Sequence, residues 1–217
     1  MYGLPSQDPA SWQATLLEAI AFDPQHLSLY QLTVEEGTPL QQLVRDKKTV
    51  MPGEDQVLLM DEVTAKSCGI AGFEQYEISN YAKPGFACYH NINYWQNGAY
   101  LASGASAVSC INGVREKRVE DPKEYIRRIN SGLSVTIDSE FLSLEASFRE
   151  SVIMGLRMQS GVSRHRLFER YGIDLEKYYG AVLIKLIKQK LIELTDCHLK
   201  LTSLGRRFAN QIMADLV

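Results

Sequence analysis

His26-Leu27-Ser28-Leu29-Tyr30-Gln31-Leu32 is the stretch that decides the fold class of this 217-residue chain. It is short and rich in Leu and Tyr, as is typical of a buried strand. A helix precedes it, because Asp8-Pro9 supplies a capping residue and a first-turn proline, and Asp23-Pro24 ends the helical pattern. A helix followed by a buried strand is half of a βαβ unit, and such units build parallel sheets or barrels. The sequence therefore predicts an α/β fold in which residues 1–3 end the preceding strand.

Two segments follow the predicted strand ends, Gly3-Leu4-Pro5 and Thr33-Val34-Glu35-Glu36. Ligands in such folds gather at the carboxyl ends of the strands. We therefore expect both segments at the functional edge of the sheet. The simpler interpretation is that Gly3-Leu4-Pro5 is an ordinary turn and that Thr33 caps a strand.

The rest of the first part of the chain alternates helices and strands. Hydrophobic periodicity and the turn residues between the periodic segments predict these elements. They are helices over 38–48, 55–71 and 123–130, strands over 73–78 and 133–137, and a hairpin over 111–119 that turns at Asn112-Gly113. An Asn-Gly pair is a strong signal for a two-residue hairpin turn.

Residues beyond about 140 show a different pattern. Helices are predicted over 143–158, over 163–171 and from Asp174 onward, then a hairpin over 191–201 and a last helix over 202–216. Together they make a winged-helix-like unit. The net charge changes from −7 over residues 1–140 (11 Lys+Arg, 18 Asp+Glu) to +4 over residues 141–217 (12 and 8). We therefore predict two domains, residues 1–138 and 139–217.

A dense cluster of aromatic and polar side chains occupies Cys88-Tyr89-His90-Asn91-Ile92-Asn93-Tyr94-Trp95. Pro84-Gly85 before it and Asn97-Gly98 after it are turn signals, so we expect the cluster in or beside an irregular connection. Imidazole is the commonest proximal haem ligand, and flat aromatic rings suit a porphyrin face. The alternative is an aromatic corner that fills a core, with His90 as a hydrogen-bonded structural residue.

His90-Asn91-Ile92-Asn93-Tyr94-Trp95 resembles the HNxxYW haem-binding signature of HemW-type proteins. These are the haem-chaperone branch of the radical-SAM family that also contains the oxygen-independent coproporphyrinogen III oxidases. Further stretches resemble the same branch in the same order, at 1–7, 26–32 and 76–82, and residues 155–205 resemble its C-terminal helical domain. The resemblance implies the C-terminal part of an incomplete (β/α) radical-SAM-type barrel, followed by a mostly helical winged-helix-like domain.

The resemblance also implies which residues bind ligands. The haem-binding set is His90, Asn91, Tyr94 and Trp95. His90 would attach haem, Asn91 would orient its ring, and the two aromatic side chains would pack against the macrocycle. The set that would line an S-adenosylmethionine pocket is Gly3, Leu4, Leu32, Thr33 and Gly104.

The small-residue run around Gly104 departs from the family pattern. Ala102, Ser103, Ser106 and Val108 stand where Gly, Ile, Gly and His are expected. The four cysteines, Cys68, Cys88, Cys110 and Cys197, show no CxxxCxxC spacing, so no iron–sulfur cluster is read from them, and we expect free thiols. S-adenosylmethionine and a [4Fe–4S] cluster are therefore expected only if an N-terminal part is present, and we expect this chain to be an N-terminally incomplete version.

Composition places the chain among soluble globular proteins, with 45% hydrophobic and 23% charged residues. No apolar run approaches the roughly 18–20 residues that span a bilayer, and no signal peptide is visible, so we expect a cytoplasmic protein. The other histidines, His26, His165 and His198, have no neighbour at metal-site spacing. We expect His26 to be structural and the other two to lie on the surface.

Three functions compete. The favoured one is haem binding and trafficking, with haem or porphyrin as ligand and haem-acceptor proteins as partners. The second is coproporphyrinogen III oxidation by a full-length form. The third is DNA binding, because many DNA-binding regulators share the winged-helix outline, and Arg164, His165, Arg166 and Arg170 form a basic cluster on its second helix. A solvated charged face is the simpler explanation of that cluster, so we expect no nucleic-acid partner. The open edge of an incomplete sheet would favour a homo-oligomer.

Overall fold

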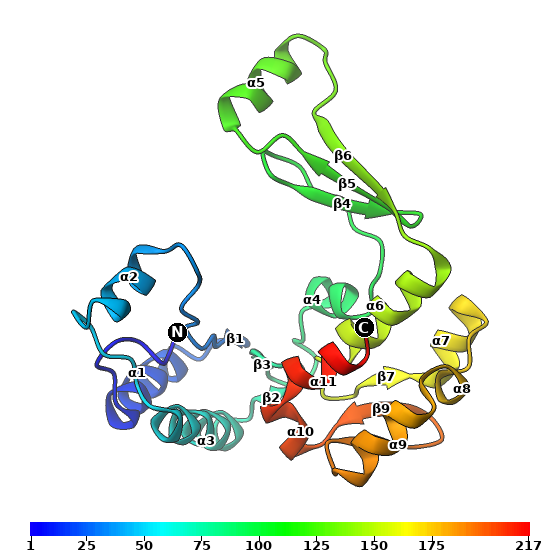
Figure 1. The fold of residues 1–217 in the computed structure, drawn as a ribbon. Helices are drawn as coiled ribbons and strands as arrows, with labels where there is room; N and C mark the ends of the chain where they lie inside the picture. The colour runs from blue at the N-terminus through cyan, green and yellow to red at the C-terminus, as the bar shows by residue number, and fades with distance from the viewer. The chain divides into compact units, whose positions relative to one another are not determined.

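The computed structural model describes residues 1–217, and the chain divides into two compact units, Met1–Cys88 and Tyr89–Val217 (Figure 1). Both units mix helices with short strands, so the predicted α/β class is confirmed at that level. Each unit has its own hydrophobic core. The three sheets have three strands each, and none closes into a barrel.

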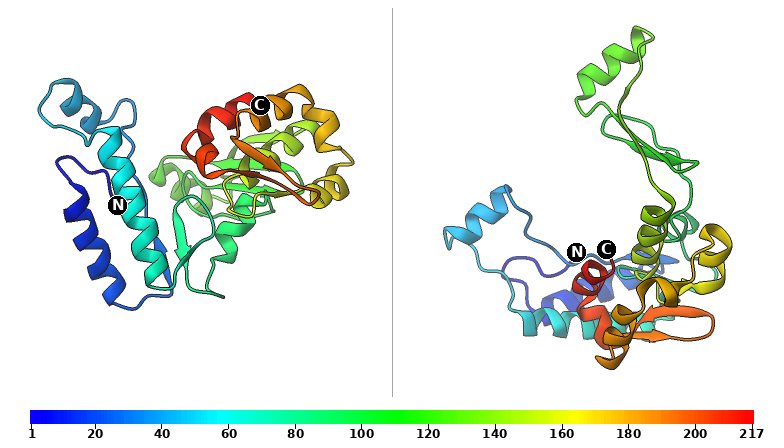
Figure 2. Two further views of the ribbon diagram at one scale, coloured as in Figure 1. Left: turned by 90° about the horizontal axis from the view of Figure 1, so that it is seen from below. Right: turned by 45° about the vertical axis from the view of Figure 1, so that its right-hand side comes forward.

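The first unit contains three helices and three strands. They are α1 (Pro9–Ala21), β1 (His26–Ser28), α2 (Pro39–Arg45), α3 (Glu54–Ile70), β2 (Glu74–Gln75) and β3 (Asn80–Ala82). Asp8 caps α1 as expected, since its carboxylate accepts from the Ser11 amide. Helices α1 and α3 lie side by side (Figure 2), and Trp12, Leu16 and Met60 are buried between elements of this unit.

The pairing of these strands corrects part of the sequence-based expectation. The sheet order is β1-β3-β2 and both pairs are antiparallel. A parallel bridge does exist between Tyr2 and Gln31, where the Tyr2 amide donates to the Tyr30 carbonyl at 3.0 Å. The residues on either side of α1 therefore pair in parallel, as a βαβ unit requires. Strand β1 itself, however, forms its hydrogen-bonded ladder with β3, and that pairing is antiparallel.

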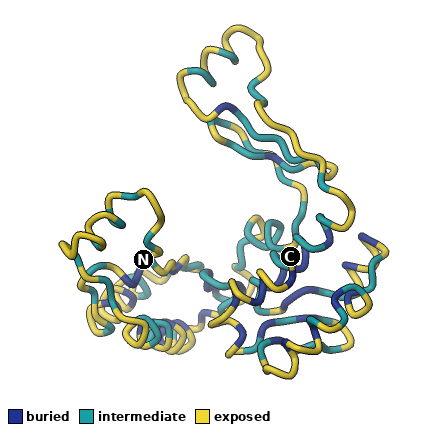
Figure 3. Tube along the Cα trace, in the orientation of Figure 1, coloured by how far each residue is buried: buried dark blue, intermediate teal, exposed yellow.

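The second unit begins with α4 (Tyr89–Trp95) and continues into a projecting arm, residues 99–141. The arm contains β4 (Val108–Ile111), β5 (Val114–Arg118), α5 (Pro122–Asn130) and β6 (Thr136–Phe141). Its antiparallel sheet has the order β4-β5-β6, and Figure 1 shows α5 at the end remote from α6. Asn112 and Gly113 both have positive φ, 53° and 77°, so the predicted two-residue hairpin turn is confirmed. Most of α5 and β6 is exposed (Figure 3).

The remaining residues build the winged-helix-like part. Its elements are α6 (Leu144–Gly155), β7 (Val162–Ser163), α7 (Arg164–Tyr171), α8 (Leu175–Tyr179), α9 (Ala181–Lys188), β8 (Ile192–Leu194), β9 (His198–Leu201), α10 (Ser203–Arg207) and α11 (Ala209–Asp215). The predicted third helix is split in two because Gly180 has φ 41° and ψ −110°, and the predicted last helix is interrupted at Phe208. Strand β7, missed in the sequence, joins the hairpin in the order β7-β9-β8.

The division into units after Cys88 is earlier than the boundary predicted at 138/139. That boundary lies inside β6, which pairs with β5, and the charge change coincides with the passage from β6 to α6. A boundary at 138/139 within the second unit stays a prediction. No helix of the chain has the length and apolar composition needed to cross a membrane.

Candidate functional site

The aromatic cluster forms helix α4, with a turn on either side of it. We expected the cluster in or beside an irregular connection, and the flanking turns are confirmed: Gly85 has φ 85° and Asn97 has φ 50°. The cluster itself is helical, which the turn residues did not indicate. Its side chains therefore project from a helix at about 100° per residue and not from a loop.

Helix α4 ends in a Schellman motif. The Asn97 amide donates to the Tyr94 carbonyl at 2.9 Å, and the Gly98 amide donates to the Asn93 carbonyl at 2.8 Å. The Asn93 side chain crosses the same turn and donates to the Ala99 carbonyl at 3.0 Å. A Cβ at Gly98 would lie 2.1 Å from the Asn93 side-chain oxygen. The end of α4 is thus fixed by two backbone bonds and by the Asn93 side chain, which occupies the space that a Cβ at position 98 would need.

His90 and Tyr94, one turn apart, lie together on α4. The His90 side chain is exposed, and its ring contacts the Tyr94 ring edge-on, with centroids 4.8 Å apart and an interplanar angle of 74°. Tyr94 in turn stacks on Tyr100, with centroids 4.4 Å apart. Partial burial raises the pKa of the Tyr100 hydroxyl, which keeps it neutral at ordinary pH. The three rings form one continuous series that begins at a solvent-accessible imidazole.

Trp95 lies away from this series. Five residues after His90 on a helix, its side chain projects about 140° around the axis. The guanidinium of Arg157 lies over the Trp95 ring, 4.8 Å from the centroid. The Trp95 indole Nε1 and the Arg157 Nε are both buried without a hydrogen-bond partner. The structure therefore brings together His90 and Tyr94 of the predicted haem-binding set and places Trp95 on another face; Asn91 is half-buried on the same helix.

Four residues of the predicted S-adenosylmethionine set lie near one another in the first unit. The Leu32 amide donates to the Tyr2 carbonyl at 2.9 Å, and Gly3, with φ 71°, lies close enough that its Cβ would be 3.8 Å from the Leu32 amide nitrogen. Leu4 and Thr33 follow them and are exposed. Gly104, the fifth residue, belongs to the second unit, where its amide donates to the Tyr125 hydroxyl at 3.2 Å.

The other histidines and the cysteines do not form a metal site. The His26 ring bonds to the Tyr76 hydroxyl at 2.9 Å, in line with a structural role, and the exposed His165 lies 3.1 Å from Glu169. His198 is half-buried on β9, although we expected it on the surface. All four cysteines are free thiols, and no group of three His, Cys, Asp or Glu side chains is placed to hold a metal ion.

The sequence did not reveal a cavity of about 560 Å³ in the second unit. Its lining comes from α4 and the turn after it, the end of α6, helix α7 and strand β9. It includes Trp95, Arg166 and Arg170, but no Asp or Glu. Arg166 and Arg170 had appeared in the sequence as part of a basic cluster. No local signal in the sequence indicates that they line one cavity with Trp95, which lies 71 and 75 positions earlier in the chain.

Comparison with known proteins gives a consistent set of relatives. The HemN C-terminal domain family matches residues 142–208. The protein named Heme chaperone HemW from Bacillus subtilis (strain 168) is 32% identical over 212 residues, which cover 98% of this chain and 56% of that protein. Its Escherichia coli (strain K12) counterpart of the same name is 41% identical over 107 residues, covering 49% of this chain and 27% of that protein.

A solved structure matches the fold. It is described as "Coproporphyrinogen III oxidase (HemN) from Escherichia coli is a Radical SAM enzyme", and it superposes with a TM-score of 0.77 at 18% identity. The match covers 99% of this chain and 53% of that one, and at this identity it shows a shared fold alone. The chain spans about half the length of the curated relatives it matches.

Proposed function

Because this chain belongs to the family of HemW-type haem chaperones and HemN-like radical-SAM proteins, we propose that it binds haem and takes part in haem trafficking, with His90 as the residue that reaches the iron. The observation that supports this proposal is the exposed imidazole of His90 held edge-on against Tyr94, which stacks on Tyr100. An accessible imidazole beside a flat aromatic surface is what an iron porphyrin requires of a protein.

The residues fit haem as a cargo. The Tyr94 ring restricts the orientation of the imidazole on one side, and the exposure of His90 leaves the other side open to a ligand. Tyr94 and Tyr100 extend the apolar contact along the macrocycle. We place Asn91 beside His90 as the residue that orients it, and Trp95 as a wall of the adjoining cavity. Proteins that accept haem from the chain would be its partners.

Two further elements of the family belong to the same proposal. We propose that the parallel pairing of Tyr2 with Gln31 is the end of a barrel of the kind found in radical-SAM proteins, and that Gly3, Leu4, Leu32 and Thr33 line its ligand edge. The chain's own cysteines do not fit a [4Fe–4S] cluster. Cys68 lies in the core of the first unit, and the others lie in no group of three metal-binding side chains. Coproporphyrinogen III oxidation remains the alternative for a longer protein.

Haem titration of the full chain tests the proposal. We expect haem to give a Soret shift on binding, and His90→Ala to weaken binding by at least tenfold because the iron loses its protein ligand. The matched control is His165→Ala, which removes another exposed imidazole from the second unit and should leave the titration unchanged. Equal Soret shifts and affinities for wild type and His90→Ala would reject His90 as the ligand.

A further inference from the structure

The cavity beside α4 carries positive charge that its own walls do not neutralise. Arg166 and Arg170, one turn apart on α7, both line it, and none of its lining residues is acidic. No carboxylate pairs with either guanidinium; Arg170 donates instead to the Gln96 carbonyl at 3.2 Å, and Arg164 on the same helix is paired with Glu176. Two guanidinium groups at the opening of one cavity favour a ligand with carboxylate groups, which arginine binds in bidentate fashion.

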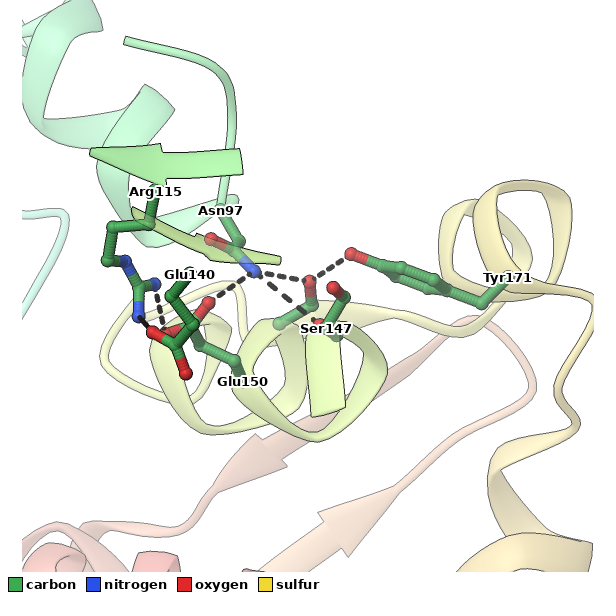
Figure 4. Close-up of polar contacts among 7 residues, drawn as sticks. Asn97, Arg115, Glu140, Ser147, Glu150 and Tyr171 are labelled. Carbon is green, nitrogen blue, oxygen red and sulfur yellow. Dashed lines mark hydrogen bonds and ion pairs between the residues drawn. The ribbon is translucent and has the colours of Figure 1, made fainter. Parts of the chain in front are cut away.

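Glu150, an acidic residue beside the cavity, is already neutralised. Glu150 lines an adjacent cavity of about 230 Å³ together with Arg170. Its carboxylate accepts from Arg115 at 2.6 Å and from the Asn97 amide at 3.2 Å (Figure 4). The Glu150 carboxylate is therefore committed to residues outside the larger cavity, and the charge of Arg166 remains available to a ligand.

The interior of the cavity suits a flat apolar body. Trp95 forms one wall, fixed by Arg157 over its ring, and Met158 and Leu167 contribute apolar surface. Also in the lining, the Ser151 hydroxyl is bonded to the Tyr171 hydroxyl at 2.6 Å and accepts from Asn97 at 3.0 Å, so this polar pair is satisfied. A volume of about 560 Å³ is typical of small-molecule sites.

We propose that this cavity binds the carboxylate-bearing edge of a tetrapyrrole, with Arg166 and Arg170 holding the carboxylates and Trp95 contacting the ring. A tetrapyrrole combines a flat apolar ring with carboxylates at one edge, which is the combination that the lining matches. This inference rests on the proposed haem-binding function. It assigns Arg166 and Arg170 of α7, which lie outside the HNxxYW signature. It also places Trp95 of that signature in the cavity, on a different face of α4 from His90.

A metal-free porphyrin tests the cavity without the iron. Protoporphyrin IX has both propionates but no metal, so an imidazole cannot ligate it, and its own fluorescence reports binding to the full chain. We expect Arg166→Gln to weaken this binding roughly fivefold and Arg166→Gln with Arg170→Gln to weaken it more than tenfold. Arg207→Gln, at an exposed arginine on α10, removes the same charge elsewhere and should leave the affinity unchanged.

Two measurements on the wild-type chain keep the test independent of variant folding. Raising the salt concentration should weaken protoporphyrin binding, because guanidinium–carboxylate pairs near the surface are screened. A porphyrin with cationic N-methylpyridyl groups in place of carboxylates should bind at least tenfold more weakly. Unchanged affinity in the double arginine variant, or salt-independent binding with equal affinity for the cationic porphyrin, would overturn the proposal.

The two proposals fail separately. If haem binding depends on His90 while protoporphyrin binding ignores Arg166 and Arg170, the cavity assignment is wrong and the haem proposal stands. If protoporphyrin binding depends on the arginines while the Soret shift ignores His90, the cavity assignment stands and the ligand assignment fails.

Discussion

Arg115 of strand β5 donates to the carboxylate of Glu150 on helix α6 at 2.6 Å, and this ion pair joins the arm to the helix beneath it (Figure 4). The second oxygen of Glu150 accepts from the Asn97 side chain, directly after the Schellman end of α4. One carboxylate therefore ties together the arm, α4 and α6. The hydrogen bond between Arg115 and Glu150 raises the pKa of Arg115, so the guanidinium stays charged throughout the accessible pH range.

Replacement of Glu150 should destabilise the second unit. Glu150→Ala removes one acceptor from two half-buried donors, leaving Arg115 with the longer contact to Glu140 and Asn97 with Ser151. Loss of the hydrogen bond between the two charged groups should cost about 1–3 kcal/mol. Urea unfolding followed by circular dichroism measures the loss. The matched control is Glu140→Ala, because Glu140 also pairs with Arg115 but at 3.5 Å and with 57% of its side chain exposed. Glu140→Ala should change the free energy of unfolding by less than about 0.5 kcal/mol. Equal losses in the two variants would contradict the assignment of the junction to Glu150.

A second prediction concerns the C-terminal end of α4. Gly98→Ala places a methyl group where the Asn93 side-chain oxygen lies, so Asn93 must move and its bond to the Ala99 carbonyl is lost. We expect a loss of about 1–2 kcal/mol in the free energy of unfolding. Removing the Asn93 side chain vacates the space, so Asn93→Ala with Gly98→Ala should cost less than the sum of the two single changes. Strictly additive losses would show that the steric conflict with Asn93 is not the cause.

A third prediction concerns how the stability of the first unit depends on pH. The Tyr2 hydroxyl donates to Asp61 at 2.5 Å, and burial, the largest cause, raises the pKa of Asp61 above its usual 3.8, while the bond from Tyr2 opposes the shift. A pKa raised in the folded state gives stability that is fully present below the unfolded pKa and is lost as pH rises through the folded value. Asp61→Asn keeps an oxygen acceptor for Tyr2 without a charge to desolvate. The stability of Asp61→Asn relative to wild type should therefore increase as pH rises from 3.8 through the raised pKa of Asp61.

Asp8 provides the control with the opposite sign. Its bonds to the Ser11 amide, the largest cause, and to the Ser11 hydroxyl lower the pKa of the Asp8 carboxyl. A lowered pKa gives stability that is present above the unfolded value and is lost as pH falls through the folded one. Asp8→Asn should therefore lose stability relative to wild type as pH rises. Urea titrations of the full chain at several pH values measure both slopes, and slopes of the same sign would contradict the electrostatic explanation.

Local signals in the sequence were sufficient for many elements. Asp8-Pro9, Asp121-Pro122 and Ser143 mark helix starts that the structure confirms, because capping depends on residues within one turn. The Asn112-Gly113 hairpin follows for the same reason. The break at Gly180 was missed, since an apolar stripe continues across it from Leu175 to Ile187.

The candidate site was predicted less completely. His90 and Tyr94 were singled out correctly as neighbours, but the turn residues around them concealed the helix, whose formation depends on packing against α6. Trp95 was assigned to the same surface, and only the helical geometry separates it from His90. The cavity depends on contacts between segments more than 50 residues apart, and no periodicity within one segment reports such contacts.

Strand β6 has a consequence for self-association of the arm. It is the outer strand of its sheet, and five of its six residues are exposed, which would ordinarily invite another chain to add a strand there. Asp138 and Glu140 lie opposite Lys117 and Arg115 of the adjacent strand β5, but these cations pair more closely with Glu120 and Glu150. A second copy approaching that edge would bring its own carboxylates against these without additional cations. The acidic residues of β6 thus disfavour the addition of a strand from another chain at the open edge of the arm.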